Sequence, residues 1–328
     1  MKNILIHNYK NIISVENILE AWQEFLRGKR NKPDVQEFSL GLMDNIFNLH
    51  YDLSHHTYKH GSYQQFNIND PKQRIIHKAN VIDRLLHHAV YKKLYPFFDK
   101  TFIADSFSCR NNKGTHKALS RLREFGYIVS KNNTKTCWIL KCDIKKFFAS
   151  IDQPTLIKIL EKYIQDKDTI NLLKEVIFSF KPNGLPLGNL TSQLFSNIYL
   201  NEFDQFIKHK LKAKYYIRYA DDFIILSENK KYLEDIIKLI SYFLQIKLKL
   251  QIHPDKIYIK TLSSGIDFLG WVHFVNYRVL RTKTKKRMFE RLKNNPNLET
   301  LNSYLGLIKH GNTEKLKHSD FYVIMNEK

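Results

Sequence analysis

Residues 215–227 read YYIRYADDFIILS, and this stretch decides how the rest of the chain is interpreted. Two apolar runs, 215–220 and 223–227, flank the adjacent acids Asp221 and Asp222, which predicts two strands joined by a tight hairpin. A two-residue hairpin turn favours Asn-Gly or Asp-Gly, because both central residues need positive φ. Asp-Asp suits such a turn poorly and places two like charges side by side. The pair therefore indicates chemistry more than turn geometry.

A third acid follows an apolar run in the same way. Asp143 ends the stretch CWILKCD (137–143), which is typical of a short strand. Carboxylates gathered near a core repel one another and lose hydration unless a cation compensates them. Oxygen ligands of this kind suit Mg²⁺, and two such ions stabilise the attacking and leaving oxygens of an in-line phosphoryl transfer. The alternative is that these are ordinary solvated turn acids, which for Asp143 alone is an equally good interpretation.

The charge of the chain indicates a polyanionic partner. Its 328 residues include 53 Lys and Arg against 32 Asp and Glu, a formal net charge of +21. Nucleic acid is the favoured partner, with an anionic membrane surface or simple solubility as alternatives. The 43% hydrophobic and 13% aromatic content provides for a packed core and excludes a disordered basic tail. Three cysteines without metal-ligand spacing argue against a disulfide framework or a zinc finger.

The location and the secondary structure follow from simple patterns. No apolar run of about 18 residues occurs and the amino terminus is polar, so we expect a cytoplasmic protein without a membrane span. The chain becomes extended from Tyr63, and 249–281 is expected to be rich in strands. Apolar spacing of three to four predicts helices, one of them ending near Gly126, over 16–30, 37–53, 79–100, 113–131, 153–180, 189–211 and 231–248.

Seven motifs then occur in a fixed order. They are PKQR (71–74), SFSCRNNKGTH (106–116), DIKKFF (143–148), GLPLGNLTSQ (184–193), YADD (219–222), HPDK (253–256) and FLGW (268–271). This series resembles the prokaryotic, group II intron-like reverse transcriptases. The resemblance implies an α/β (α+β) right-hand polymerase with fingers, a palm built on a small antiparallel sheet plus helices, and a short helical thumb. The implied divisions are an N-terminal helical extension (1–57), fingers and palm (58–280) and a basic, thumb-like helical segment (281–328).

The resemblance also implies roles for individual residues. Asp143, Asp221, Asp222 and the carbonyl of Ile144 would hold two Mg²⁺ ions, for which Mn²⁺ can substitute. Phe147 and Phe148 would lie at the nucleotide, where Phe148 would exclude the ribose 2′-hydroxyl. The alternative is that one of the two is simply core. The remaining nucleotide-binding residues would be Lys72, Arg74, Leu187, Gly188, Gln193 and Lys256. Phe268, Leu269, Gly270 and Trp271 would grip the primer, and Lys283, Lys285, Lys286 and Arg287 would follow the nucleic-acid backbone.

Several of these roles have plainer alternatives. Lys256 matches a lysine that protonates the leaving pyrophosphate, but it is equally well interpreted as a surface lysine. Gly188 would permit close backbone approach to the nucleotide, whereas Asn189 and Thr191 suit a helix cap. The segment 281–293 is either a nucleic-acid-tracking thumb helix or a solvated helix.

The loop around Gly188 narrows the resemblance. Many prokaryotic members have QG followed by three residues and SP, whereas this chain has Leu187 before the glycine and Gln193 after Ser192. That pattern is similar to the reverse transcriptases of bacterial or phage-encoded diversity-generating retroelements, which copy RNA with frequent errors at adenines. The implied partners are template RNA, a primer, dNTPs and a small basic oligomeric accessory variability protein, with no membrane. The alternatives are a retron, phage-defence or intron-type reverse transcriptase, or a non-catalytic RNA-binding protein on a polymerase scaffold.

Overall fold

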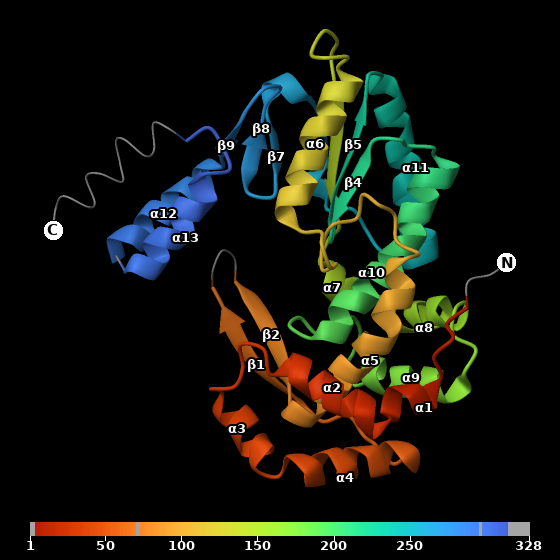
Figure 1. Ribbon diagram of the computed structural model, residues 1–328. Helices are drawn as coiled ribbons and strands as arrows, with labels where there is room; N and C mark the ends of the chain where they lie inside the picture. The colour runs from red at the N-terminus through yellow and green to blue at the C-terminus, as the bar shows by residue number, and fades with distance from the viewer. Residues whose placement is uncertain (1–3, 70–72, 295–296, 314–328) are drawn as a thin grey trace.

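Three antiparallel sheets organise the computed structural model, which describes residues 4–69, 73–294 and 297–313 (Figure 1). One pairs β1 (Tyr63–Ile68) with β2 (Arg74–Ala79). The central sheet has the order β4-β5-β3-β6, and the third has the order β7-β8-β9. Their strands are β3 (Trp138–Asp143), β4 (Tyr216–Tyr219), β5 (Asp222–Ser227), β6 (Tyr258–Thr261), β7 (Ile266–Phe268), β8 (Trp271–His273) and β9 (Arg278–Leu280). The small antiparallel sheets with helices confirm the predicted fold class.

The N-terminal helices share a core with the centre of the chain. They are α1 (Tyr9–Ile13), α2 (Val15–Phe25), α3 (Pro33–Leu40) and α4 (Leu42–Ser54). The first three contact α5 (Val81–Asp99), and α4 packs against those three. The buried amide of Asn17 donates to the carbonyls of Ile12 and Ala89, which links α1 and α5. The single helix expected over 37–53 is wrong. It is interrupted at Gly41, whose backbone freedom makes helix continuation unfavourable.

The central sheet separates two hydrophobic cores. Phe223 and Ile225 of β5 pack in the core that includes α10 (Leu190–Gln205) and α11 (Lys230–Leu248). Ile224 and Leu226 pack in the core that includes α6 (Thr115–Val129), and Figure 1 shows α6 and α11 on opposite sides of the sheet. This follows from the alternation of side chains along a strand.

Helix α6 continues through Gly126, contrary to the predicted end at that residue. A Cβ at Gly126 would lie 2.7 Å from Cδ2 of Leu262. The glycine therefore allows close packing of the helix against the segment after β6. It is not a stop signal here.

The remaining helices complete the layers. The stretch 153–180 forms two helices, α8 (Gln153–Glu161) and α9 (Lys167–Phe178), preceded by α7 (Phe147–Ser150). A π-helical turn, Phe206–Lys210, extends α10. At the carboxyl side, α12 (Thr282–Asn294) and α13 (Leu298–Ile308) pack on the third sheet through Met288, Leu292 and Tyr304. None of the described helices is long and apolar enough to span a membrane.

Candidate functional site

The β4–β5 hairpin carries two of the predicted acids. Tyr219 pairs with Asp222, so the two turn residues are Ala220 and Asp221, and Asp222 is the first residue of β5. The tight hairpin is confirmed, but the prediction that both aspartates form the turn is wrong. Ala220 has a positive φ of 54°, whereas Asp221 does not, so only the first turn residue takes the left-handed conformation. Asp222 is consequently held by the strand ladder.

Asp143 lies directly opposite this hairpin. The antiparallel register of β3 and β5 pairs Asp143 with Asp222. Just beyond the strand, the amide of Ile144 donates to the carbonyl of Asp221 at 3.2 Å. Three acids from two distant segments therefore meet at one end of the central sheet.

The neighbouring cations only partly compensate these carboxylates. Lys256 Nζ lies 2.8 Å from Asp143 Oδ1, and Lys141 Nζ lies 3.2 Å from Asp222 Oδ2. Burial raises the pKa of Asp222 to about 7, even though Lys141 opposes the rise. Burial and the charge of Asp143 also raise the pKa of Asp221, against the weaker opposing effect of Lys256 and Arg74. The site therefore favours the approach of a further cation.

The donor atoms suit a hard divalent ion. Asp222 Oδ1 is buried and has no hydrogen-bond partner among the described residues. The available ligand atoms are carboxylate oxygens and the carbonyl of Ile144, which are the types that Mg²⁺ and Mn²⁺ prefer. Within the described ranges, however, no three His, Cys, Asp or Glu side chains are already arranged to hold a metal ion. The chemistry fits Mg²⁺, and in this structure lysines contact two of the three acids.

A buried ion pair that the sequence analysis missed supports the hairpin. Arg218 and Asp204 are both 0% exposed and bond in two places, Nε to Oδ1 at 2.7 Å and Nη2 to Oδ2 at 2.6 Å. The Tyr216 hydroxyl donates to the same carboxylate, and Arg218 Nη1 donates to the carbonyl of Ala220 at 3.2 Å. The turn is thus fixed to α10. The sequence sign of this buried ion pair was an arginine within the otherwise apolar run 215–220.

Lys141 is the second missed residue. It precedes Asp143 by two positions on β3, so both side chains lie on the same face of the strand. Besides Asp222, its ammonium donates to the carbonyl of Asp267 at 2.6 Å. Lys141 therefore links the acids to strand β7. A lysine inside the apolar stretch 137–143 was the visible sign.

The glycine loop contacts the β1–β2 hairpin. The amide of His77 donates to the carbonyl of Leu187 at 2.9 Å, and Asn189 Nδ2 donates to the carbonyl of His77 at 2.9 Å. Gly188 has φ +107°, and a Cβ there would lie 2.7 Å from Ile76 Cγ2. Its close approach is therefore to β2. Asn189 occupies the N-cap position of α10 without a capping side-chain bond, so that alternative is wrong for Asn189.

Around this loop, the other predicted nucleotide residues have different environments. Arg74 is exposed at the start of β2, and Gln193 is half-buried in the first turn of α10. The carbonyl of Phe148 accepts from the amide of Leu185 at 2.8 Å, which places α7 beside the loop. Lys72 lies outside the described residues.

The two phenylalanines of α7 differ in burial. Phe147 is 2% exposed and belongs to the core, so its assignment to nucleotide binding is wrong. Phe148 is half-buried and meets Phe147 edge to face at 5.4 Å. Phe148 stays the predicted steric gate.

The predicted primer grip is a hairpin with a buried aromatic base. Phe268 and Trp271 are 0% and 2% exposed, so their rings build the core and do not face a primer. The turn residues Leu269 and Gly270, with φ 52° and 86°, are half-exposed. Any side-chain or backbone contact with a primer would therefore come from the turn.

The basic residues of α12 lie on its solvent side. Lys283 and Lys286 are exposed, whereas Lys285 and Arg287 are half-buried. The opposite face buries Met288 and Leu292. The helix is therefore amphipathic, with its basic residues outside the core.

Comparisons with known proteins agree with this arrangement. A family model described as reverse transcriptase (RNA-dependent DNA polymerase) matches residues 59–273. Protein YkfC of Escherichia coli K12 is 24% identical over 244 residues, covering 62% of this chain and 62% of that protein. The group II intron-encoded protein LtrA of Lactococcus lactis subsp. cremoris is 26% identical over 294 residues, covering 67% of this chain and 47% of that protein. The chain thus spans 62% and 47% of the length of these two relatives.

Solved structures show the same fold at low identity. Telomerase from Candida albicans, in complex with a fragment of telomeric RNA, matches with a TM-score of 0.53 and 12% identity. The match covers 74% of this chain and 51% of that one. Truncated apo telomerase from Candida tropicalis matches with a TM-score of 0.51 and 16% identity, covering 67% and 55%.

Proposed function

Because this chain belongs to the reverse transcriptase family, we propose that it is an RNA-directed DNA polymerase that copies template RNA into cDNA. The observation that carries the proposal is the meeting of Asp143, Asp221 and Asp222 at one end of the central sheet. Burial raises the pKa of Asp221 and of Asp222 by more than the nearby cations lower it. A carboxylate that served only the stability of the fold would be better paired.

In the proposed reaction, the primer 3′-hydroxyl attacks the α-phosphate of a dNTP and the bond to pyrophosphate breaks. Asp143, Asp221, Asp222 and the carbonyl of Ile144 would hold the divalent ions. When bound, such ions stabilise the attacking and leaving oxygens. The chain itself contributes mainly positioning, because a preorganised site avoids the cost of reorganisation during reaction.

Other side chains act on the nucleotide. The charge of Arg74 acts on Asp221, where it opposes the rise in pKa. The planar guanidinium of Arg74 would bind the triphosphate oxygens. Phe148 would exclude the 2′-hydroxyl of a ribonucleotide by overlap. Lys256, whose ammonium contacts Asp143, would give a proton to the leaving pyrophosphate. Gln193 would lie beneath the nascent base pair.

The decisive experiment is primer extension by the purified chain on an RNA template with dNTPs and Mg²⁺. We expect cDNA that depends on the metal ion. RNA binding without any incorporation, in Mg²⁺ or Mn²⁺, would support the non-catalytic scaffold instead.

We further propose that the copying is error-prone and serves a diversity-generating retroelement. Leu187 replaces the glutamine common at this loop, and an aliphatic side chain cannot offer the hydrogen bonds of Gln. The loop is held to β2 through the backbone carbonyl of Leu187, so its side chain is not needed for this contact. The loop with Leu187 should therefore restrain the nucleotide less tightly than a loop with glutamine at this position. A preference for errors at adenine is suggested only by the resemblance.

Sequencing cDNA made from a defined RNA tests this proposal. The wild-type chain should misinsert most at template adenines, and Leu187→Gln should lower the error rate. Rare errors, or errors spread evenly over the four template bases, would favour an intron-type enzyme, to which the similarity with LtrA also points. An adenine-substituted repeat pair and a small basic accessory gene beside the coding region would support the retroelement.

A further inference from the structure

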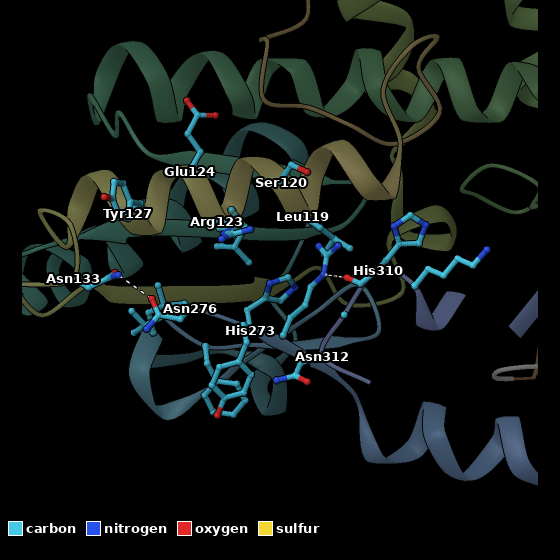
Figure 2. A pocket seen from close by; sticks show the side chains of 18 residues that line it. Leu119, Ser120, Arg123, Glu124, Tyr127, Asn133, His273, Asn276, His310 and Asn312 are labelled. Carbon is cyan, nitrogen blue, oxygen red and sulfur yellow. Dashed lines mark hydrogen bonds between the residues drawn. The ribbon is translucent and has the colours of Figure 1, made fainter. Parts of the chain in front are cut away.

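A cavity of about 860 Å³ lies away from the three acids, between α6, the β8–β9 connection and the segment after α13 (Figure 2). Helix α6 begins near the hairpin, where the Thr115 hydroxyl bonds that of Tyr219 at 3.2 Å. Arg123, which lines the cavity, lies eight residues further on, about 12 Å along the helix axis. The cavity is therefore separate from the proposed polymerisation site.

Two arginines give the cavity a positive charge. Arg123 and Arg278 both line the cavity, and the charge of Arg123 adds to burial in lowering the pKa of Arg278. Among the described residues, no ion pair includes either of them. Arg278 Nε donates to the carbonyl of His310 and its guanidinium lies 5.3 Å from the centre of the Trp271 ring, so its other N–H groups would meet the anion. Glu124 also lines the cavity, but both of its carboxylate oxygens accept from Arg121 at 2.8 Å. This arrangement favours an anion between Arg123 and Arg278.

Flat rings and amides surround these charges. Phe274 and Tyr277 stack with their centroids 4.8 Å apart, and Tyr277 is 50% exposed. Asn133 Nδ2 donates to Asn276 Oδ1 at 3.1 Å at one side of the cavity, and Figure 2 shows both amides there. Exposed rings beside amide groups can stack on a base and hydrogen-bond to its edges.

A buried histidine provides an independent indication. His273 lines the cavity and is 4% exposed, and its ring lies in the middle of the group drawn in Figure 2. Its Nε2 has no hydrogen-bond partner among the described residues. Burial, with the charge of Arg278, lowers the pKa of His273 to about 4, so the ring is neutral at pH 7. A neutral imidazole nitrogen without a partner can serve a polar ligand.

We propose that this cavity binds a nucleotide of single-stranded RNA outside the polymerisation site, with its phosphate on Arg123 and Arg278 and its base against Tyr277. An acidic peptide would use the arginines but would leave the stacking ring and the amides without a role. The idea that the ligand is the template strand rests on the proposed function. Binding there would anchor a length of RNA while the other end is copied.

Three variants on the full chain test the site. Arg123→Gln and Tyr277→Leu remove exposed parts of the cavity, and Lys117→Gln makes the same charge change on an exposed residue of α6 that does not line it. The probe is fluorescent poly-uridine RNA, with affinity measured at several salt concentrations. Arg123→Gln should weaken binding and flatten the log–log salt slope by about 0.7. Tyr277→Leu should weaken binding about tenfold with the slope unchanged.

Two further experiments locate the bound RNA and test an acidic peptide as the alternative ligand. Poly-uridine containing 4-thiouridine should cross-link to peptides that include Tyr277 or Tyr127, which also lines the cavity. Wild-type affinity in both cavity variants, or a loss no larger than that of Lys117→Gln, would overturn the site. Arg123-dependent binding of a polyglutamate peptide, without such dependence for RNA, would assign the cavity to an acidic protein and also overturn it.

Primer extension on a short RNA hairpin, which serves as both template and primer, separates this inference from the proposed function. If the wild type extends the hairpin but RNA affinity is insensitive to the cavity variants, the inference fails and the polymerase assignment stands. If the variants weaken RNA binding but no chain extends the hairpin, the cavity stands and the polymerase assignment fails.

Discussion

Asp204 of α10 and the two acids of the β4–β5 hairpin differ in how fully neighbouring groups compensate their charges. Asp204 is fully enclosed and accepts bonds from Arg218 and Tyr216, so its charge is matched. Asp221 and Asp222 are half-buried, yet Asp222 Oδ1 has no partner among the described residues and the pKa of both acids is raised. The fold can satisfy a buried carboxylate where it needs only stability. Although Lys141 contacts Asp222 Oδ2, Asp222 Oδ1 stays available for a ligand.

The largest expected effect comes from removing an unmatched charge. Asp221→Asn should lower dNTP incorporation at least about 10²-fold, since the site would lose electrostatic stabilisation of the reaction. RNA affinity and the free energy of unfolding should not fall, because a buried charge with a raised pKa is not stabilising. Primer extension and urea unfolding measure both, with Asp235→Asn on exposed α11 as the control. Undiminished polymerisation by Asp221→Asn would mean that Asp221 is not needed for catalysis.

The matched pair should behave in the reverse manner. Arg218→Met leaves Asp204 buried without its cation, which should lower the free energy of unfolding by about 3–5 kcal/mol. The double variant Arg218→Met with Asp204→Leu should recover part of that loss. Urea denaturation of the three proteins measures it. A cost below about 1 kcal/mol for the single variant would mean that the pair is not needed for stability.

The two phenylalanines of α7 test the same distinction with uncharged groups. Phe148→Val should lower the ratio of dNTP to rNTP incorporation about tenfold or more, because the 2′-hydroxyl gains room. Phe147→Leu is the control, since Phe147 is buried and should affect stability with the ratio unchanged. An unchanged ratio in Phe148→Val would make Phe148 a packing residue.

The half-buried His88 stays neutral at pH 7, because its surroundings disfavour the charged ring. Burial, with Lys29 and Arg84, lowers the pKa of His88 to about 4. Between pH 6.5 and 4 the unfolded chain therefore binds more protons, so stability is complete above pH 6.5 and is lost as the pH falls. Urea unfolding at pH 7 and pH 5 should show a difference that His88→Gln reduces by about 1 kcal/mol. An equal difference in the variant would assign the effect to other groups.

The smallest effect is expected at the exposed surface. Lys283→Gln with Lys286→Gln should flatten the log–log salt dependence of single-stranded RNA binding by about 1.4, if each lysine neutralises one phosphate. Stability should not change, since both residues are exposed. Titrations at several salt concentrations give the slope. An identical slope would make this face of α12 a solvated one.

What the sequence could predict was local. The two apolar runs within 215–227 predicted the hairpin, and the helices followed from their apolar spacing. The turn was displaced by one residue because the position of Asp222 depends on its pairing with Tyr219 and on Lys141, which comes from another strand. The Gly188 contact and the Arg218–Asp204 pair likewise join distant segments. A contact between residues that are far apart in the sequence cannot be predicted from the spacing of neighbouring residues.

The division of β5 between two cores has a consequence for sequence change. Phe223 and Ile225 face one core and Ile224 and Leu226 the other, so a one-residue insertion would exchange every side chain between them. It would also move Asp222 away from Asp143. Substitutions of similar size disturb one core at a time and are tolerated far better. We therefore expect this strand to vary in composition among functional relatives while keeping its length, and insertions to occur in the loops around it.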